Sequence, residues 1–112
     1  MKLVTAIIQP HMLEQVQKAL VRHGVSGMTI SEVSGYGRQR GHSEVYRGEA
    51  YTIDFILKVR LEVLVHDNEV ASLIEVIANS ARTGQVGDGK VWSVPVDTVV
   101  RVRTGESGHD AI

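Results

Sequence analysis

The chain of 112 residues has no cysteine, two prolines and few aromatic rings: one tryptophan, three tyrosines and one phenylalanine. The lack of cysteine excludes disulfides and thiolate chemistry, and it permits a reducing compartment. With so few rings, the core must be aliphatic, built from Val, Ile, Leu and Ala. The length fits one domain, residues 1–112, without room for a separate regulatory domain.

Long hydrophobic runs and an excess of one charge are also missing. Residues 1–10 contain only a short apolar run, which is too short for a signal peptide or for the roughly 20 apolar residues of a membrane span. We therefore expect a cytoplasmic protein. The formal net charge of −1 gives no electrostatic footprint for nucleic acid, so we expect no nucleic-acid partner.

The first half of the chain has the pattern strand, helix, strand. Residues 2–9 are rich in β-forming side chains and stop at Pro10, which cannot continue a strand ladder. Apolar residues then recur at helical spacing until Gly24, a natural helix end. Residues 27–33 are typical of a strand, because apolar side chains stand two apart.

The second half repeats this order. Strict alternation over residues 59–65 predicts a strand, and apolar positions over 70–81 give the strongest helical stripe in the chain. Asp67 or Asn68 can cap that helix. Residues 90–94 begin the last strand.

Two such units in series predict an α+β fold, a ferredoxin-like βαββαβ sandwich with both helices on one face of a four-stranded antiparallel sheet. The other face holds apolar residues such as Leu64, which suggests burial by further copies of the chain. Between the second and third strands lies a long connection, residues 34–51, with four glycines and three arginines. Connections of this length are typically functional or mobile.

Gly84 to Lys90 match most of a phosphate-binding P-loop, G-x-x-x-x-G-K. However, Val91 replaces the magnesium-binding Ser or Thr, and the order is helix, loop, strand, so this is not a Walker motif. Gly84, Gly87 and Gly89 still allow backbone amides to approach an anion, and Lys90 adds a positive charge. A flexible helix end and turn is the alternative interpretation.

Two further basic segments favour phosphate or nucleotide binding. Residues 98–103 are expected to complete the last strand after Pro95, which would place Arg101 and Arg103 on the same side of the sheet. Arginine matches phosphate geometry bidentately, although two solvated surface arginines remain the alternative. Residues 35–41 are also basic and rich in glycine.

Catalytic patterns do not accompany these segments. The histidines have no metal-ligand spacing, and His42 with Glu44 is more simply explained by solvated side chains than by a metal site. No serine has a G-x-S-x-G context, and no carboxylate pair is placed for acid–base work. Two alternatives remain: a small trimeric ATP-hydrolysing or phosphotransfer enzyme, and an RNA-binding module, which would need aromatic rings on its sheet.

The same segments closely resemble the PII signal-transduction proteins over essentially the whole chain. "GYGRQRGHSEVYRGEAY" resembles their T-loop (about residues 37–55), "TGQVGDGKVW" their B-loop (82–90) and "VRVRTGE" the start of their C-loop (102–109). The tail "RTGESGHDAI" is similar to actinobacterial members. The resemblance implies a homotrimer and a non-enzymatic nitrogen-regulatory transducer that senses ATP, ADP and 2-oxoglutarate and controls partners through its T-loop.

The resemblance also implies the site residues, with the nucleotide between neighbouring subunits and 2-oxoglutarate bound with ATP and Mg²⁺ at the T-loop base. The nucleotide-binding residues would be Ile7, Thr29, Gly35, Gly37, Arg38, Leu64, Gly87, Asp88, Gly89, Lys90, Arg101 and Arg103. The 2-oxoglutarate-binding residues would be Gln39, Arg40, Gly41, Lys58 and Gly87, with Gln39 also a magnesium ligand.

Modification and partners follow from the same likeness. Tyr51 matches the reversibly nucleotidylylated tyrosine, although Glu49 stands where Ala or Ser is usual. The implied partners are an ammonium channel, through which alone the protein would meet a membrane, and a nucleotidylyltransferase or other nitrogen-assimilation enzymes.

Overall fold

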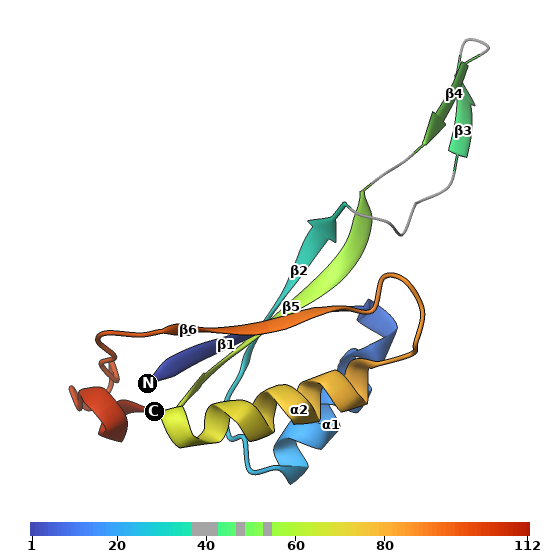
Figure 1. The fold of residues 1–112 in the computed structure, drawn as a ribbon. Coiled ribbons are helices and arrows are strands. Elements are labelled where there is room, and N and C mark those ends of the chain that lie inside the picture. Colours follow the sequence, from blue (N-terminus) through green and yellow to red (C-terminus); the bar gives the residue numbers. More distant parts are fainter. Residues whose placement is uncertain (37–42, 47–48, 53–54) are drawn as a thin grey trace.

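A computed structural model describes residues 1–36, 43–46, 49–52 and 55–112 (Figure 1). The strands are β1 (Lys2–Ile8), β2 (Thr29–Gly35), β3 (Ser43–Tyr46), β4 (Glu49–Thr52), β5 (Ile56–Val65) and β6 (Gly89–Pro95). The helices are α1 (Leu13–Arg22) and α2 (Val70–Ala81), with short 3-10 turns η1 (Pro10–Met12), η2 (Asp67–Glu69) and η3 (Gly108–Ala111). None of the described helices is long and apolar enough to cross a membrane.

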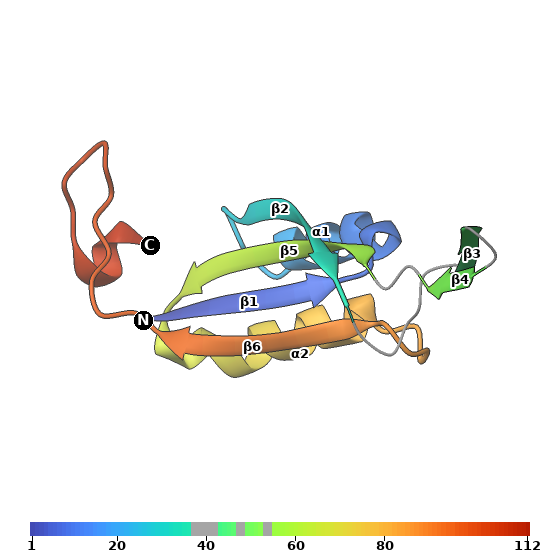
Figure 2. The same ribbon diagram turned by 90° about the horizontal axis from the view of Figure 1, so that it is seen from above.

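Four strands form one antiparallel sheet in the order β2-β5-β1-β6, and both helices cover the same face of it (Figures 1 and 2). This is the expected ferredoxin-like arrangement. The register places Ile8 opposite Val59 on one side and Gly89 on the other, and Lys2 opposite Val65 and Pro95. The sheet therefore has two distinct ends, one where β6 begins and one where the chain begins.

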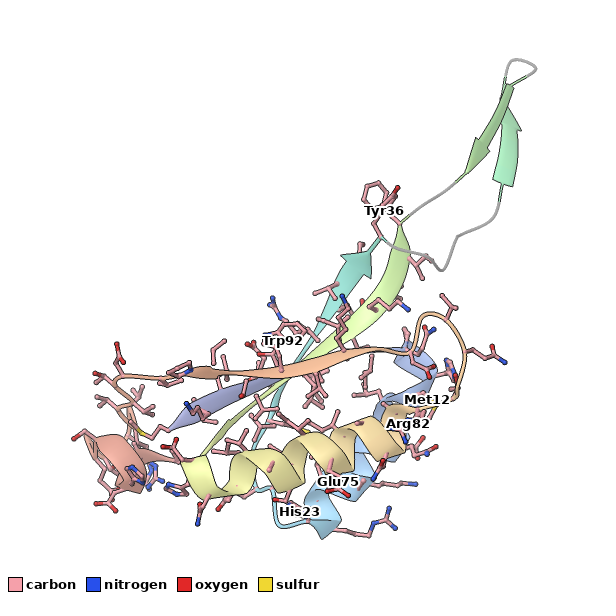
Figure 3. The ribbon with its side chains drawn as sticks, viewed as in Figure 1. Met12, His23, Tyr36, Glu75, Arg82 and Trp92 are labelled. Atoms are coloured by element: carbon pink, nitrogen blue, oxygen red, sulfur yellow. The ribbon has the colours of Figure 1, made fainter. Side chains whose placement is uncertain are left out.

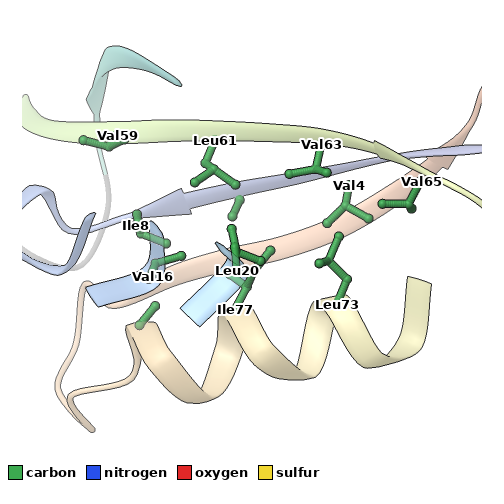
Figure 4. Packing of buried hydrophobic residues seen from close by; sticks show 12 residues of the cluster. Val4, Ile8, Val16, Leu20, Val59, Leu61, Val63, Val65, Leu73 and Ile77 are labelled. Atoms are coloured by element: carbon green, nitrogen blue, oxygen red, sulfur yellow. The ribbon is translucent and has the colours of Figure 1, made fainter. Parts of the chain in front are cut away.

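The core lies between the sheet and the helices and is aliphatic, as the composition predicts (Figure 4). Alternate residues of β1 and β5 point toward the helices, where Leu20 of α1 and Leu73 and Ile77 of α2 meet them. The fully buried Leu61 lies at the centre of this layer. Truncation of such a residue to alanine typically costs about 2–5 kcal/mol, because a cavity remains.

The opposite face of the sheet has a mixed character. Trp92 and Val94 of β6 and Leu64 of β5 are each about two-fifths exposed there, at 41%, 41% and 37%. Figure 3 shows Trp92 on the side of β6 away from the helices. Thr5 lies opposite Trp92 in β1 and is only 5% exposed, so neighbouring strands already shield the centre of this face.

The expectation of a last strand over residues 98–103 is wrong. β6 ends at Pro95 opposite Lys2, and the Val96 amide donates the next hydrogen bond to the Met1 carbonyl at 3.1 Å. Beyond that point β1 has no residues left to pair with a continuing strand. The chain turns instead, with one isolated bridge between Val100 and Ser107, so Arg101 and Arg103 do not share a face of a strand.

The expected cap of the second helix is also wrong. Asp67 and Asn68 belong to the 3-10 turn η2, which precedes α2. Asp67 Oδ1 instead accepts a hydrogen bond from the N-terminal ammonium of Met1 at 2.7 Å. The ammonium holds the pKa of Asp67 below its ordinary value, so the chain start is tied to this turn at ordinary pH.

The long connection contains secondary structure that the sequence does not predict. Within it, β3 and β4 pair as a two-stranded antiparallel hairpin, separate from the main sheet (Figure 1). In the structure the connection between β2 and β5 runs from Tyr36 to Phe55, and the ring centroids of these two residues lie 6.5 Å apart. Figure 3 places Tyr36 at the end of β2, where the connection leaves the sheet.

Candidate functional site

A cleft of about 400 Å³ opens where the loop between α2 and β6 meets the ends of β1 and β2 and the start of β5. Its lining residues are Ile7, Gly35, Tyr36, Ile56, Lys58, Val86, Gly87, Gly89, Lys90 and Trp92. Six of these are sequence-predicted site residues, which lie as far apart in the chain as Ile7 and Lys90. The structure therefore places one group of the expected residues at one end of the sheet.

Gly89 allows the end of the B-loop, residues 82–90, to lie against the backbone of β1, where β6 begins to pair. Its φ is 103°, a conformation that favours glycine. A Cβ at this position would lie 2.8 Å from the carbonyl carbon of Ile7 and still closer to its oxygen. Only glycine therefore permits the pairing of β6 with β1 to begin here.

The Asp88 carboxylate braces the B-loop from inside. Its Oδ2 accepts hydrogen bonds from the amides of Thr83 at 2.8 Å and Gly84 at 2.9 Å, and its Oδ1 accepts one from the Thr83 hydroxyl. The Thr83 hydroxyl, followed by the backbone amides, holds the pKa of Asp88 below its ordinary value. The side chain of Asp88 thus binds its own loop, and the loop keeps its shape over the ordinary pH range.

Lys58 joins the B-loop to the sheet. Lys58 lies in β5 and is only 8% exposed. Its Nζ donates a hydrogen bond to the Gly87 carbonyl oxygen at 2.7 Å. Burial lowers the pKa of Lys58, and the Asp88 carboxylate offsets part of that effect. The cleft therefore has a buried cation at its base and Lys90 on its wall.

A second cleft, of about 780 Å³, contains the predicted residues Thr29 and Leu64. It lies near the other end of the sheet and is also lined by Ile112, the last residue. Lys58 and Leu64 are six positions apart in β5, which corresponds to about 20 Å along a strand. Within the part of the chain that the structure describes, the predicted nucleotide residues thus fall into two groups at different ends of the sheet.

Arg101 and Arg103 lie near the second group, because Arg101 contacts Ile112. Arg101 Nη2 donates to the Ile112 carbonyl at 3.3 Å, and Arg101 Nη1 pairs with Glu106 at 3.0 Å. The backbone of Arg101 also accepts from Gly105 and donates to Glu106, which closes the turn that carries the exposed Arg103. A carboxylate thus already faces Arg101.

The chain is similar to known proteins in both sequence and fold. The family model described as nitrogen regulatory protein P-II matches residues 1–106. The chain is 50% identical to nitrogen regulatory protein P-II of Azospirillum brasilense, and also 50% identical to that of Microchaete diplosiphon. Each alignment covers the full length of both chains. In structure it is similar to Arabidopsis thaliana PII bound to citrate, with a TM-score of 0.81 and 39% identity over 99% of this chain and 91% of that one.

The chain belongs to the P-II family. It is thus a member of a nitrogen-regulatory signalling family rather than of an enzyme family. The P-II fold also accounts for the ferredoxin-like sheet described above, because the Arabidopsis structure matches it over nearly the whole chain.

Several expected residues lie outside the described part of this P-II chain. They are Gly37, Arg38, Gln39, Arg40 and Gly41, which include the expected magnesium ligand. Tyr51 lies in β4, opposite Glu44 in β3, but the position of its side chain is also outside the description. The roles of these residues remain predictions.

The sequence-based prediction omits four residues that line the first cleft, beside the B-loop: Tyr36, Ile56, Val86 and Trp92. Trp92 had a usable signal, because it stands two residues after Lys90 in a strand and therefore shares its face. Thr83 was missed too, although a hydroxyl five residues before an aspartate in a glycine-rich loop can close the loop. Tyr36 and Ile56 can be recognised as cleft residues only once β2 and β5 are known to pair.

Proposed function

We propose that the protein binds ATP or ADP between neighbouring copies of a homotrimer. The observation that carries this proposal is the division of the basic and glycine-rich residues between two ends of one sheet. One copy would supply the B-loop cleft with Lys90, and its neighbour would supply Arg101, Arg103, Thr29 and Leu64. Cyclic assembly repeats such a head-to-tail contact and closes it.

The exposed face of the sheet supports assembly as well. Trp92, Val94 and Leu64 present apolar surface there, and a copy of the same chain would cover it. Trp92 also lines the B-loop cleft, so a neighbour on this face would stand directly beside the site.

Phosphate binding in the B-loop rests on backbone shape and charge. Gly87 and Gly89 have positive φ, which lets the loop present its backbone to an anion, and Lys90 adds a cation. Asp88 keeps its role as the internal brace rather than a phosphate contact, because its carboxylate is occupied by Thr83 and Gly84. Arg38 and Gly37, from the segment outside the described residues, would complete the site.

A dicarboxylate effector, 2-oxoglutarate, would bind with ATP and Mg²⁺ near Lys58. Lys58 supplies a buried positive charge at the cleft base, and charge-assisted contacts are strong in such surroundings. The Arabidopsis relative is described as bound to citrate, a polycarboxylate, which supports a carboxylate site in this fold. Gln39, Arg40 and Gly41 would complete the site, with Gln39 on the magnesium ion.

Residues 37–55 would communicate to partner proteins which ligand is bound. Each ligand would select a different arrangement of this segment, and partners would distinguish the arrangements. An ammonium channel, a nucleotidylyltransferase and other nitrogen-assimilation enzymes are the proposed partners, and Tyr51 is the proposed modification site. The proposed assignment needs no chemical step by the protein itself.

Titration calorimetry tests the ligand assignment. We expect ATP with Mg²⁺ to permit 2-oxoglutarate binding, and Lys90→Ala to weaken both ATP and ADP by about tenfold or more, because a charged phosphate contact is lost. The exposed Lys18, paired only across the surface of α1, provides the matched control Lys18→Ala. Absence of 2-oxoglutarate heat with ATP present would contradict effector sensing, and unchanged ADP affinity in Lys90→Ala would remove Lys90 from the site.

A further inference from the structure

Two histidines that the sequence keeps 43 positions apart meet at the end of the sheet opposite the B-loop. His66 Nδ1 and His109 Nδ1 lie 3.0 Å apart, and the two rings are stacked with centroids 4.9 Å apart and an angle of 23° between planes. His66 follows β5, and His109 belongs to η3 near the chain end. Spacing along the sequence gives no sign of this pair.

The separation of the two nitrogens suits a shared metal ion. Imidazole nitrogens bind zinc at about 2.0–2.1 Å, which puts two ligand nitrogens about 3.3 Å apart in a tetrahedral site and about 2.9 Å apart at a right angle. The observed 3.0 Å falls close to the right-angle value and needs only a small opening for the tetrahedral one. A hydrogen bond between the rings also fits this distance, with one nitrogen as donor.

The surroundings admit a cation from solvent. His109 is exposed and His66 half-buried, so the pair is open on one side. Asp67 follows His66 directly and interacts electrostatically with His109, but its carboxylate is already paired with the Met1 ammonium at 2.7 Å, so the two imidazoles themselves supply the metal binding.

We propose that His66 and His109 form a binding site for a divalent transition-metal ion of the class that prefers imidazole, such as Zn²⁺ or Ni²⁺. Among the described residues no group of three or more His, Asp or Glu side chains forms a metal cluster, so water or a group from another molecule completes the coordination. Mg²⁺ and Ca²⁺ prefer oxygen ligands and are excluded from this pair. The site is thus separate from the magnesium ion proposed with the nucleotide.

The metal would link the end of the chain to the body of the protein. His109 lies in η3, and the Ile112 carbonyl accepts a hydrogen bond from Arg101. A bound ion would therefore fix the segment that holds Arg101, whereas the pair without metal leaves this segment attached by hydrogen bonds. The expected sign is slower hydrogen exchange of the amides of residues 108–112 when metal is bound.

Calorimetric titration of the metal-free protein with Zn²⁺, repeated with Ni²⁺, tests the site. We expect one ion per chain, and a loss of affinity of at least about tenfold in both His66→Gln and His109→Gln, because each removes a direct ligand. His11→Gln is the matched control, since His11 is exposed and lies at the B-loop end of the sheet. Mg²⁺ should not displace the bound ion.

Hydrogen exchange supplies a second readout that does not depend on affinity. Zn²⁺ should slow exchange over residues 108–112 in the wild type and in His11→Gln but not in His109→Gln, with the melting temperature of each metal-free variant as the check on folding. The proposal is overturned if the wild type binds no ion, or if both glutamine variants bind the ion as tightly as the wild type. It is also overturned if Zn²⁺ does not change the hydrogen exchange of residues 108–112 in the wild type.

Discussion

At the B-loop end of the sheet, short hydrogen bonds and a glycine without room for a side chain hold a cleft in a defined shape. At the opposite end, the chain leaves the sheet, turns over residues 99–108 and ends beside a wider cleft lined by Thr29 and Leu64. The first end carries the B-loop glycines and Lys90, and the second carries Arg101 and Arg103. Neither end alone assembles the described members of the predicted set, and this division is the observation behind the proposed site between neighbouring copies.

The largest effect is expected at the most constrained position of the B-loop end. Gly89→Ala should lower the free energy of unfolding by about 3 kcal/mol or more, because the new Cβ collides with the Ile7 backbone and the φ is strained. Gly84→Ala is the matched control: its φ is also positive at 88°, but no atom lies within 4 Å of the added Cβ, so about 1 kcal/mol is expected. Urea denaturation measures both, and equal losses would show that the close approach to β1 is unimportant.

An intermediate effect is expected at Lys58. Lys58→Met keeps most of the side-chain volume but removes the charge, so 2-oxoglutarate affinity should fall by about tenfold or more, while ATP affinity changes far less. Arg60→Met is the control, because Arg60 lies on the same face of β5 but is about half exposed. Calorimetry with ATP and Mg²⁺ present separates the two, and equal losses would remove the buried cation from the effector site.

The pH dependence of stability checks the same residue. A lysine whose pKa is lowered in the folded state is costly while it is protonated, so the wild type should gain stability as pH rises from the folded pKa toward the ordinary value near 10.5. Lys58→Met should lack this gain, whereas Arg60→Met should keep it. Thermal melts between neutral and alkaline pH measure it, and parallel curves for Lys58→Met and the wild type would contradict the assigned burial effect.

The smallest effect is expected at Asp88. Its pKa is lowered in the fold, so its contribution to stability is complete above the unfolded value near 3.9 and is lost as pH falls through the folded value. Asp88→Asn should therefore melt slightly below the wild type at pH 7, and the difference should shrink in acid. Asp97→Asn is the control, since Asp97 lies outside the B-loop. A difference that stays constant down to pH 3 would show that the ionised carboxylate is not the brace.

The sequence predicted most of the fold because the decisive signals were local. The apolar stripe of α2 gives its limits directly, and the alternation in β5 identifies the face that packs on the helices. The alternation of valine and arginine over residues 98–103 was misleading, because a strand also needs a partner. Since β6 already reaches the start of β1 at Pro95, β1 offers no partner to that segment.

The part of the candidate site that forms one short sequence motif could be predicted from the sequence. Gly87, Gly89 and Lys90 stand in one short loop, so their common role could be inferred from the chain alone. Trp92, Tyr36 and Ile56 enter the cleft through the register of three strands, and the His66–His109 pair depends on how the chain end folds back. Such contacts between distant segments have no local signal.

Complementation between two defective chains tests the shared site most directly. Lys90→Ala impairs the B-loop end and Arg101→Ala the other end, so each variant alone should lose tight ATP binding. In trimers refolded from an equal mixture, a site is intact when a chain with Lys90 meets a neighbour with Arg101, and about one quarter of the sites should recover. Recovery of about that fraction in calorimetry is the predicted result; a mixture that binds no better than the two variants measured separately would contradict a site built from adjoining copies.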